Sequence, residues 1–136
     1  MKFDDIELAF MYVSSNQPFM NSAYISRQTG EVYYVSELGD SDKLPDDIDD
    51  ASIYVSIPHK NDLDLGKNLV FDFVSEFLPA DFDEVSNIFS RKGAYSRFKQ
   101  LLVRRGRLDD WYSYENEAQR TALLDWCNDN NILLTE

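Results

Sequence analysis

The sequence predicts an α+β fold in which a small three-stranded antiparallel sheet packs against about five helices. Strand-like alternation of apolar residues occurs only before residue 58, and the C-terminal half of the chain shows helical periodicity alone. A helical stripe also opens the chain, so helices from both ends are available to cover the sheet. With 136 residues, of which 43% are hydrophobic, the chain suits a single domain over residues 1–136.

The first expected helix begins at Asp4 or Asp5, either of which is a suitable N-cap. It ends where residues 16–18 read Asn-Gln-Pro. Leu8, Met11 and Tyr12 lie opposite its main stripe, so we expect this helix to be buried on more than one face. The main stripe, with helical spacing, consists of Ile6, Ala9, Phe10 and Val13.

The predicted sheet is formed by residues 23–26, 32–35 and 52–57, which are rich in β-branched and aromatic side chains. Gly30 lies in the short loop between the first two strands and supplies the positive φ that a hairpin loop needs. Residues 39–50 contain six Asp and are expected to form a solvated acidic loop. The pattern leaves open on which side of the hairpin the third strand pairs.

Four helices are expected in the C-terminal half. The first begins at Asp62 or Asp64 and stops before Pro79, and a shorter one begins within residues 81–83 and stops before Gly93. The third covers residues 94–105 and ends with Gly106 just past it.

The fourth of these helices begins near Asp109 or Asp110 and ends at residues 130–131. Asn130 and Asn131 are suitable there because Asn tolerates the left-handed conformation of a helix C-cap. One face of the helix carries Ala118, Ala122 and Trp126.

Charge is distributed unevenly along the chain. The formal net charge is −12, yet residues 85–108 carry seven Lys or Arg and no Asp or Glu. Residues 1–84 hold eighteen acids and five bases, and residues 109–136 hold seven acids and one base. We call the seven cations the basic segment: Arg91, Lys92, Arg97, Lys99, Arg104, Arg105 and Arg107.

Two interpretations of the basic segment stay open. In the first, it is a docking surface for phosphate or for an acidic partner, with exposed aromatic side chains beside it. In the second, its cations pair internally with carboxylates of residues 46–50 or 81–84. The contacts of Arg97, Lys99 and Arg104 decide between them. The candidate binding residues are Arg91, Lys92, Arg97, Lys99, Arg104, Trp111 and Tyr112.

A series of short motifs runs along nearly the whole chain. From the N-terminus they read LAF at 8–10, TGEV at 29–32, IP at 57–58, FDFV at 71–74, GAYSRFK at 93–99, WY at 111–112 and ALLDW at 122–126. In this order the chain resembles the bacterial uncharacterised protein family number 0158 of the UPF series. The resemblance implies the fold and a bacterial cytosolic setting, and it implies no catalytic role. It also marks Gly93 and Phe98 as framework positions, with Arg97 and Lys99 as polar ones.

Catalytic and metal-binding patterns do not stand out. Counted from Asp40, the acidic loop fails the ligand spacing of an EF-hand. His59 is the only histidine and is expected at the surface or rim, while Cys127, the only cysteine, is expected to be buried or half-buried. We therefore expect no metal, no cofactor and no identifiable catalytic residue.

The functional expectation is a cytoplasmic, non-enzymatic interaction or regulatory domain that binds a protein partner. Phosphate or nucleic-acid binding through Arg91–Arg107 is the first alternative, and an enzyme with an unrecognised site is the second. No apolar run approaches the ~20 residues of a membrane span, so no membrane association is expected. The strong acidity opposes generic binding to nucleic acid or anionic lipid.

Overall fold

The structure is a computed structural model that describes residues 1–15, 20–37, 39 and 41–135. The chain divides into two compact units. The first, here the sheet unit, combines Met1–Leu63 with Ala122–Glu136, and the second, the helical unit, is Asp64–Thr121. The α+β prediction is confirmed, because the described residues form one antiparallel sheet and five α-helices, with the C-terminal half helical.

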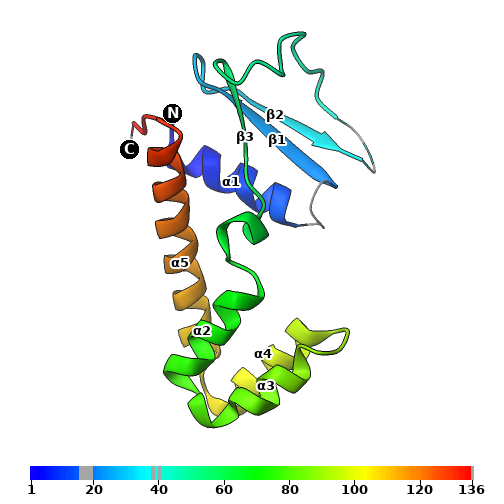
Figure 1. Ribbon diagram of the computed structural model, residues 1–136, viewed down its shortest axis with the longest axis vertical. Coiled ribbons are helices and arrows are strands. Elements are labelled where there is room, and N and C mark those ends of the chain that lie inside the picture. The colour runs from blue at the N-terminus through cyan, green and yellow to red at the C-terminus, as the bar shows by residue number, and fades with distance from the viewer. Residues whose placement is uncertain (16–19, 38, 40, 136) are drawn as a thin grey trace. The chain divides into compact units, whose positions relative to one another are not determined.

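The sheet unit contains the strands β1 (Asn21–Ser26), β2 (Val32–Ser36) and β3 (Tyr54–Ser56). Their order is β2-β1-β3, so the first strand is central and the third pairs with it on the side away from β2 (Figure 1). Gly30 has φ 76° in the turn between β1 and β2, as predicted. The short η1 helix (Lys60–Leu63) follows the sheet.

Helix α1 (Phe3–Ser14) covers one face of the sheet. The ring of Tyr12 lies edge-on to that of Tyr34, with centroids 4.9 Å apart, and Tyr34 is in register with the fully buried Ala23. Tyr33 and Tyr54 occupy the opposite face and contact each other, so only part of the aromatic content of the strands packs against a helix.

Two expectations for α1 need correction. Leu8 and Met11 are 61% and 55% exposed, so the helix is buried on its main stripe and not on a second face. Lys2 occupies the N-cap position without a side-chain cap, and Asp4 and Asp5 lie inside the first turn, where their charge favours the positive helix end. The predicted end at residues 16–18 lies outside the described residues, and α1 itself extends to Ser14.

The acidic loop covers the outer edge of β2. The carboxylate of Asp42 accepts a hydrogen bond from the backbone N–H of Tyr34 at 2.8 Å, and the N–H of Asp42 donates to the Tyr34 carbonyl at 2.8 Å. The Ser41 hydroxyl contacts both backbone groups of Ser36 in the same way. An edge strand whose polar groups are occupied is protected from pairing with another chain.

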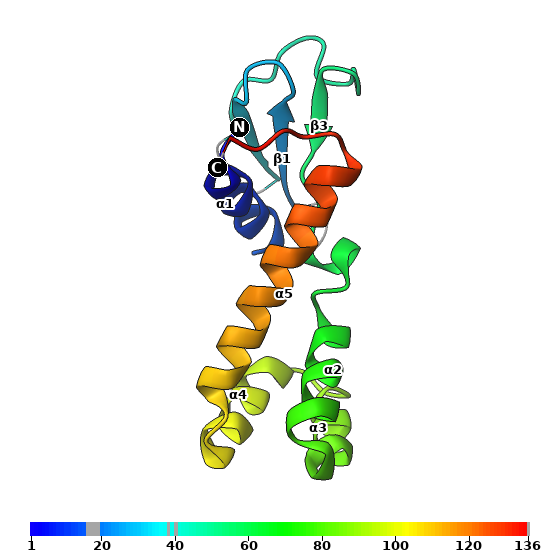
Figure 2. The ribbon, with the colours of Figure 1, turned by 90° about the vertical axis from the view of Figure 1, so that its left-hand side faces the viewer.

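The helical unit contains α2 (Lys67–Phe77), the short η2 helix (Pro79–Asp81), α3 (Phe82–Ile88), α4 (Ala94–Arg105) and most of α5 (Leu108–Asp129) (Figure 2). Its core consists of Leu69, Val70, Phe73, Val74, Leu78, Val85, Phe98, Leu101, Leu102 and Trp111. None of the predicted Asp caps is observed: Gly66 precedes α2, and Asp81 precedes α3 without a side-chain cap.

Helices α4 and α5 end in the same way. Gly106 follows α4 with φ 67°, and the N–H of Arg107 donates to the Leu102 carbonyl at 2.8 Å. Asn131 follows α5 with φ 57°, and the N–H of Ile132 donates to the Cys127 carbonyl at 2.8 Å. Both are Schellman motifs, which confirms the predicted helix ends at Gly106 and Asn131.

Within the part of the chain that the structure describes, no helix is both long and apolar enough to cross a membrane.

Candidate functional site

The basic segment belongs to the helical unit and divides into three groups of cations. Arg104, Arg105 and Arg107 are paired with carboxylates of the same unit. Lys99 lies over an aromatic ring. The remaining three lie in the turn between α3 and α4 and in the first turn of α4. We call these three the turn cations: Arg91, Lys92 and Arg97.

The strongest of the ion pairs joins Arg105 to Asp81. Nε and Nη2 of Arg105 donate to the two carboxylate oxygens of Asp81 at 3.0 and 2.9 Å, which is the bidentate geometry that suits a guanidinium. This hydrogen bonding lowers the pKa of the Asp81 carboxyl and raises that of Arg105. The sequence predicted that Asp81 starts α3 as its N-cap. Its carboxylate instead binds Arg105 at the end of α4.

The other two pairs are exposed. Arg107 donates to Asp110 at 2.9 Å across three residues, and Arg104 lies 3.9 Å from Glu84. Pairs of this kind contribute little to stability because water and salt screen them. Together with the Arg105–Asp81 pair, they do neutralise the positive charges at the end of α4 and just after it.

The turn cations are exposed, and none of them forms an ion pair with any residue that the structure describes. Gly93 enters α4 with φ 74°, and its carbonyl accepts the N–H of Arg97 at 3.2 Å. At a rise of ~1.5 Å per residue, Arg97 lies only about 4.5 Å along the helix axis from Ala94. Two of the turn cations thus precede α4 directly, and the third follows within one helical turn.

Arg97 and Lys99 occupy opposite edges of the exposed face of α4. The buried face is centred on Phe98, Leu101 and Leu102, each 0% exposed. At 100° per residue, Arg97 falls on one side of it and Lys99 on the other. The Lys99 ammonium lies 5.6 Å from the ring centroid of Tyr112, which is 39% exposed. Arg97 and Lys99 therefore border the exposed face of α4 from its two sides.

Trp111 requires a correction. It is 2% exposed and packs edge-on against Phe73 and Phe98, with ring centroids 5.3 and 5.2 Å away. A side chain in that position is part of the core and cannot offer its ring to a partner. Tyr114 is half-buried against Phe73 and Phe77, so Tyr112 is the one exposed side chain among these three aromatic residues at the start of α5.

His59 also differs from expectation, since it is 5% exposed. Its Nδ1 accepts the N–H of Asn61 at 3.0 Å, and the Asp62 carboxylate accepts the N–H of His59 at 3.0 Å. These two hydrogen bonds satisfy backbone N–H groups at the N-terminus of η1 in a manner similar to a capping box. Cys127 is 1% exposed, as expected, and burial raises the pKa of its thiol. Among the described residues, no group of three or more His, Cys, Asp or Glu is placed to hold a metal ion.

Sequence reasoning missed one functional candidate, Arg27. Its side chain lines a cavity in the sheet unit, at the end of β1. A signal was available, since Arg27 is the only arginine in the first 90 residues, in a region dominated by Asp and Glu.

A family described as an uncharacterised protein family, UPF0158, matches residues 9–135. The chain belongs to UPF0158. It is also 35% identical over 66 residues to the UPF0158 protein PA5073 of Pseudomonas aeruginosa. That alignment covers 47% of this chain and 43% of the length of the relative. No solved structure matches the chain.

Membership of UPF0158 confirms the resemblance drawn from the motifs. The most specific of them, residues 93–99, starts at the left-handed Gly93 and includes the buried Phe98. Its two cations, Arg97 and Lys99, are exposed. Framework and polar positions are thus separated in this chain as the motif predicts.

Proposed function

We propose that this member of UPF0158 is a non-enzymatic interaction domain of the bacterial cytoplasm, in which the turn cations and Lys99 bind an acidic segment of a partner protein. The observation that carries the proposal is the exposure of Arg91, Lys92 and Arg97 without an acidic partner among the described residues. Internal pairing accounts for Arg104, Arg105 and Arg107 and leaves these cations available.

Local charge supports an anionic partner. The helical unit has ten acids and nine bases, whereas the sheet unit has fifteen acids and four bases. Their formal charges are thus −1 and −11. Since salt screens charges beyond about 8 Å at physiological ionic strength, a ligand on the helical unit responds mainly to the nearby cations.

The composition of the surface favours a protein over a nucleic acid. Among the described residues, only four cations of the basic segment have no carboxylate partner, and Val103 lies on the exposed side of α4 with 63% of its surface accessible. Four phosphate contacts would give a salt slope of only about −2.8 on single strands. An acidic peptide with an apolar side chain would contact both the cations and Val103.

The proposed location in the cytoplasm agrees with the single, buried cysteine.

Fluorescence anisotropy with a fluorescein-labelled decapeptide of glutamate tests this proposal. We expect saturable binding at 20 mM salt that weakens at least tenfold, or by about 1.4 kcal/mol, in the double variant Arg91→Glu and Arg97→Glu. The matched control reverses two exposed charges of the sheet unit, Lys2→Glu and Lys43→Glu, and should bind like the parent. Equal affinities of the two double variants would overturn the proposal.

Two further measurements separate the alternatives. Tighter binding of a labelled twelve-nucleotide single strand than of the peptide would replace the protein partner with a nucleic acid. Sedimentation at low salt should show the same molecular mass for the parent and for the Arg91→Glu and Arg97→Glu variant. A dimer seen for the parent alone would instead identify a second copy of the chain as the occupant.

A further inference from the structure

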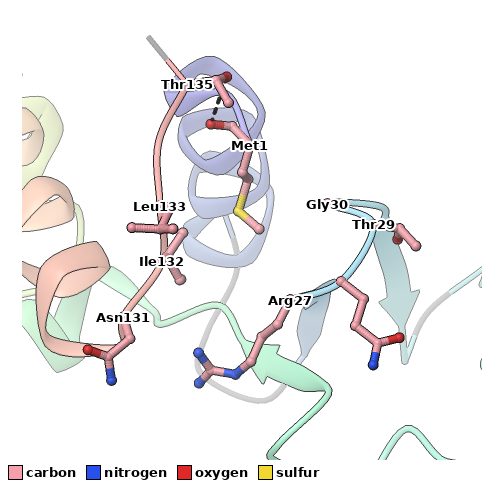
Figure 3. A pocket seen from close by; sticks show the side chains of 9 residues that line it. Met1, Arg27, Thr29, Gly30, Asn131, Ile132, Leu133 and Thr135 are labelled. Atoms are coloured by element: carbon pink, nitrogen blue, oxygen red, sulfur yellow. Dashed lines mark hydrogen bonds between the residues drawn. The ribbon is translucent and has the colours of Figure 1, made fainter.

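A cavity of about 330 Å³ lies in the sheet unit, between the hairpin turn after β1 and the residues that follow α5. Arg27, Gln28 and Asn131 contribute polar groups to its lining, and Met1, Ile132 and Leu133 contribute apolar ones. Figure 3 shows the Met1 side chain reaching toward the space between the two segments, and the Arg27 guanidinium directed toward Asn131. The residues after α5 are tied to the N-terminal residue by the N–H of Thr135, which donates to the Met1 carbonyl at 2.8 Å.

Arg27 is held rigidly but is not neutralised. Its Nε donates to the carbonyl of Ala51 at 3.3 Å, and its Nη1 donates to the carbonyl of Asn130. Both acceptors are uncharged. A guanidinium has five N–H donors, so three of those on Arg27 have no partner among the residues that the structure describes.

This arrangement is unusual for the sheet unit, whose formal charge is −11. Fifteen carboxylates are present in its sequence, yet none of those described pairs with Arg27, which is half-buried. A partly desolvated cation without a counter-charge is unfavourable, and an anion that enters the cavity would relieve that cost. The cavity therefore favours an anionic ligand, although the net charge of the surrounding sheet unit repels anions.

The lining defines the kind of anion. One planar guanidinium with parallel donors matches a carboxylate, whereas a phosphate dianion would meet one cation and a strongly acidic unit. The apolar side chains of Met1, Ile132 and Leu133 suit a short hydrocarbon body. The volume is at the lower end of the range for small-molecule sites. No lining side chain is a general base or a thiol, which favours binding over catalysis.

We propose that this cavity binds a small monocarboxylate with an apolar body, its carboxylate paired with Arg27 and its hydrocarbon part against Ile132 and Leu133. This site is separate from the turn cations, and neither proposal depends on the other.

Titration with hexanoate, followed by backbone amide NMR, tests the site. We expect saturable shifts at Gln28, Gly30 and Asn131 with a Kd of order 1 mM, or about −4 kcal/mol. Hexanol, which has the same chain length and no charge, should not saturate the site. Arg27→Gln should weaken hexanoate at least tenfold, and Arg27→Lys should retain part of the affinity.

Because Arg27 also links β1 to the end of α5, a second variant avoids disturbing the fold. Leu133 is 86% exposed, so Leu133→Asp should fold normally while its carboxylate repels the ligand and weakens hexanoate at least tenfold. Leu8→Asp adds the same charge to an exposed position outside the cavity and is the matched control. Absence of saturable shifts, equal binding of hexanol, or equal Kd values for the two Asp variants would overturn the proposal.

Discussion

Replacement of Trp111 by alanine distinguishes a core residue from a docking residue. The side chain is 2% exposed, and an aromatic residue buries about 150–250 Å² on folding. At about 25 cal/mol per Å², the transfer term is roughly 4–6 kcal/mol. Measured losses for Trp→Ala in cores are ~3–5 kcal/mol, and we expect about 4 kcal/mol here. This is a large part of the ~5–15 kcal/mol that stabilises a typical domain.

Urea unfolding followed by circular dichroism at 222 nm measures this loss, and Tyr112→Ala is the matched control. Tyr112 is adjacent in sequence but 39% exposed, with a cation–π contact to Lys99, so its removal should cost about 1 kcal/mol or less. Trp111→Phe retains an aromatic ring and should fall between the parent and Trp111→Ala. In a Trp126→Phe background, the fluorescence of the remaining Trp111 should resist quenching by acrylamide.

The opposite pattern would refute the burial of Trp111. If Trp111→Ala lost less than about 1 kcal/mol, or if Tyr112→Ala lost as much, the ring would have to be at the surface. The docking interpretation of Trp111 would then be restored. Comparable quenching of Trp111 and of free tryptophan would lead to the same conclusion.

Three further predictions concern single groups. Gly106→Ala should lower the free energy of unfolding in urea by about 1 kcal/mol, because φ is 67° at this position. An added Cβ would meet nothing within 4 Å, so no steric clash adds to this loss. Ser96→Ala, at an exposed position of α4, is the control and should leave the free energy of unfolding unchanged. The Asp81 carboxyl has a pKa below its ordinary 3.8, so the stability it contributes is complete above that value and is lost as the pH falls through the lowered pKa. Asp81→Asn should therefore destabilise the protein at pH 7 and destabilise it less as the pH falls below 3.8, and a constant difference would contradict the ion pair. The Cys127 thiol should react with a disulfide reagent about 100-fold or more slowly in the native protein than in urea, and rapid native reaction would contradict its burial.

The sequence predicted most of the elements, because periodicity reports which face of an element is buried. The same periodicity also indicates that Trp111 is buried, although Trp111 was predicted as a binding residue. Trp111 lies seven residues before Ala118 and so falls on the face defined by Ala118, Ala122 and Trp126. Extending that stripe by two turns would have placed Trp111 in the core. Composition alone, by contrast, favours tryptophan as an interface residue.

Helix starts were predicted poorly for a compositional reason. Asp is a good N-cap, but in a region with eighteen acids among 84 residues an Asp precedes most helices by chance. Asp62 accepts the N–H of His59 within η1, and Asp81 binds Arg105. Asp62 thus belongs to the start of η1 and not of α2, and the partner of Asp81 lies 24 residues away, where a local pattern does not specify it. The order of the strands was open for a similar reason, since alternation identifies a buried face and not a neighbour.

The cavity at Arg27 is beyond local reasoning altogether. It requires the hairpin turn after β1, the carbonyl of Ala51 and the residues after α5, and the hydrogen bond from Arg27 to Asn130 spans 103 positions. Only a known tertiary fold brings these segments together. A lone arginine in an acidic region was the one available indication.

Net charge is a poor guide to anion binding in this protein. The value of −12 is the sum of −11 in the sheet unit and −1 in the helical unit, and it conceals cations that carboxylates leave unpaired. In the helical unit, Arg104, Arg105 and Arg107 are paired and the turn cations are not. In the sheet unit, Arg27 donates to two carbonyl oxygens and to no carboxylate of the described residues. Because screening restricts each interaction to its surroundings, recognition of an anion depends on these few positions and not on the total. The two proposals therefore each predict that changing one or two arginines weakens the binding of an anion at least tenfold, although the chain is acidic with or without the change.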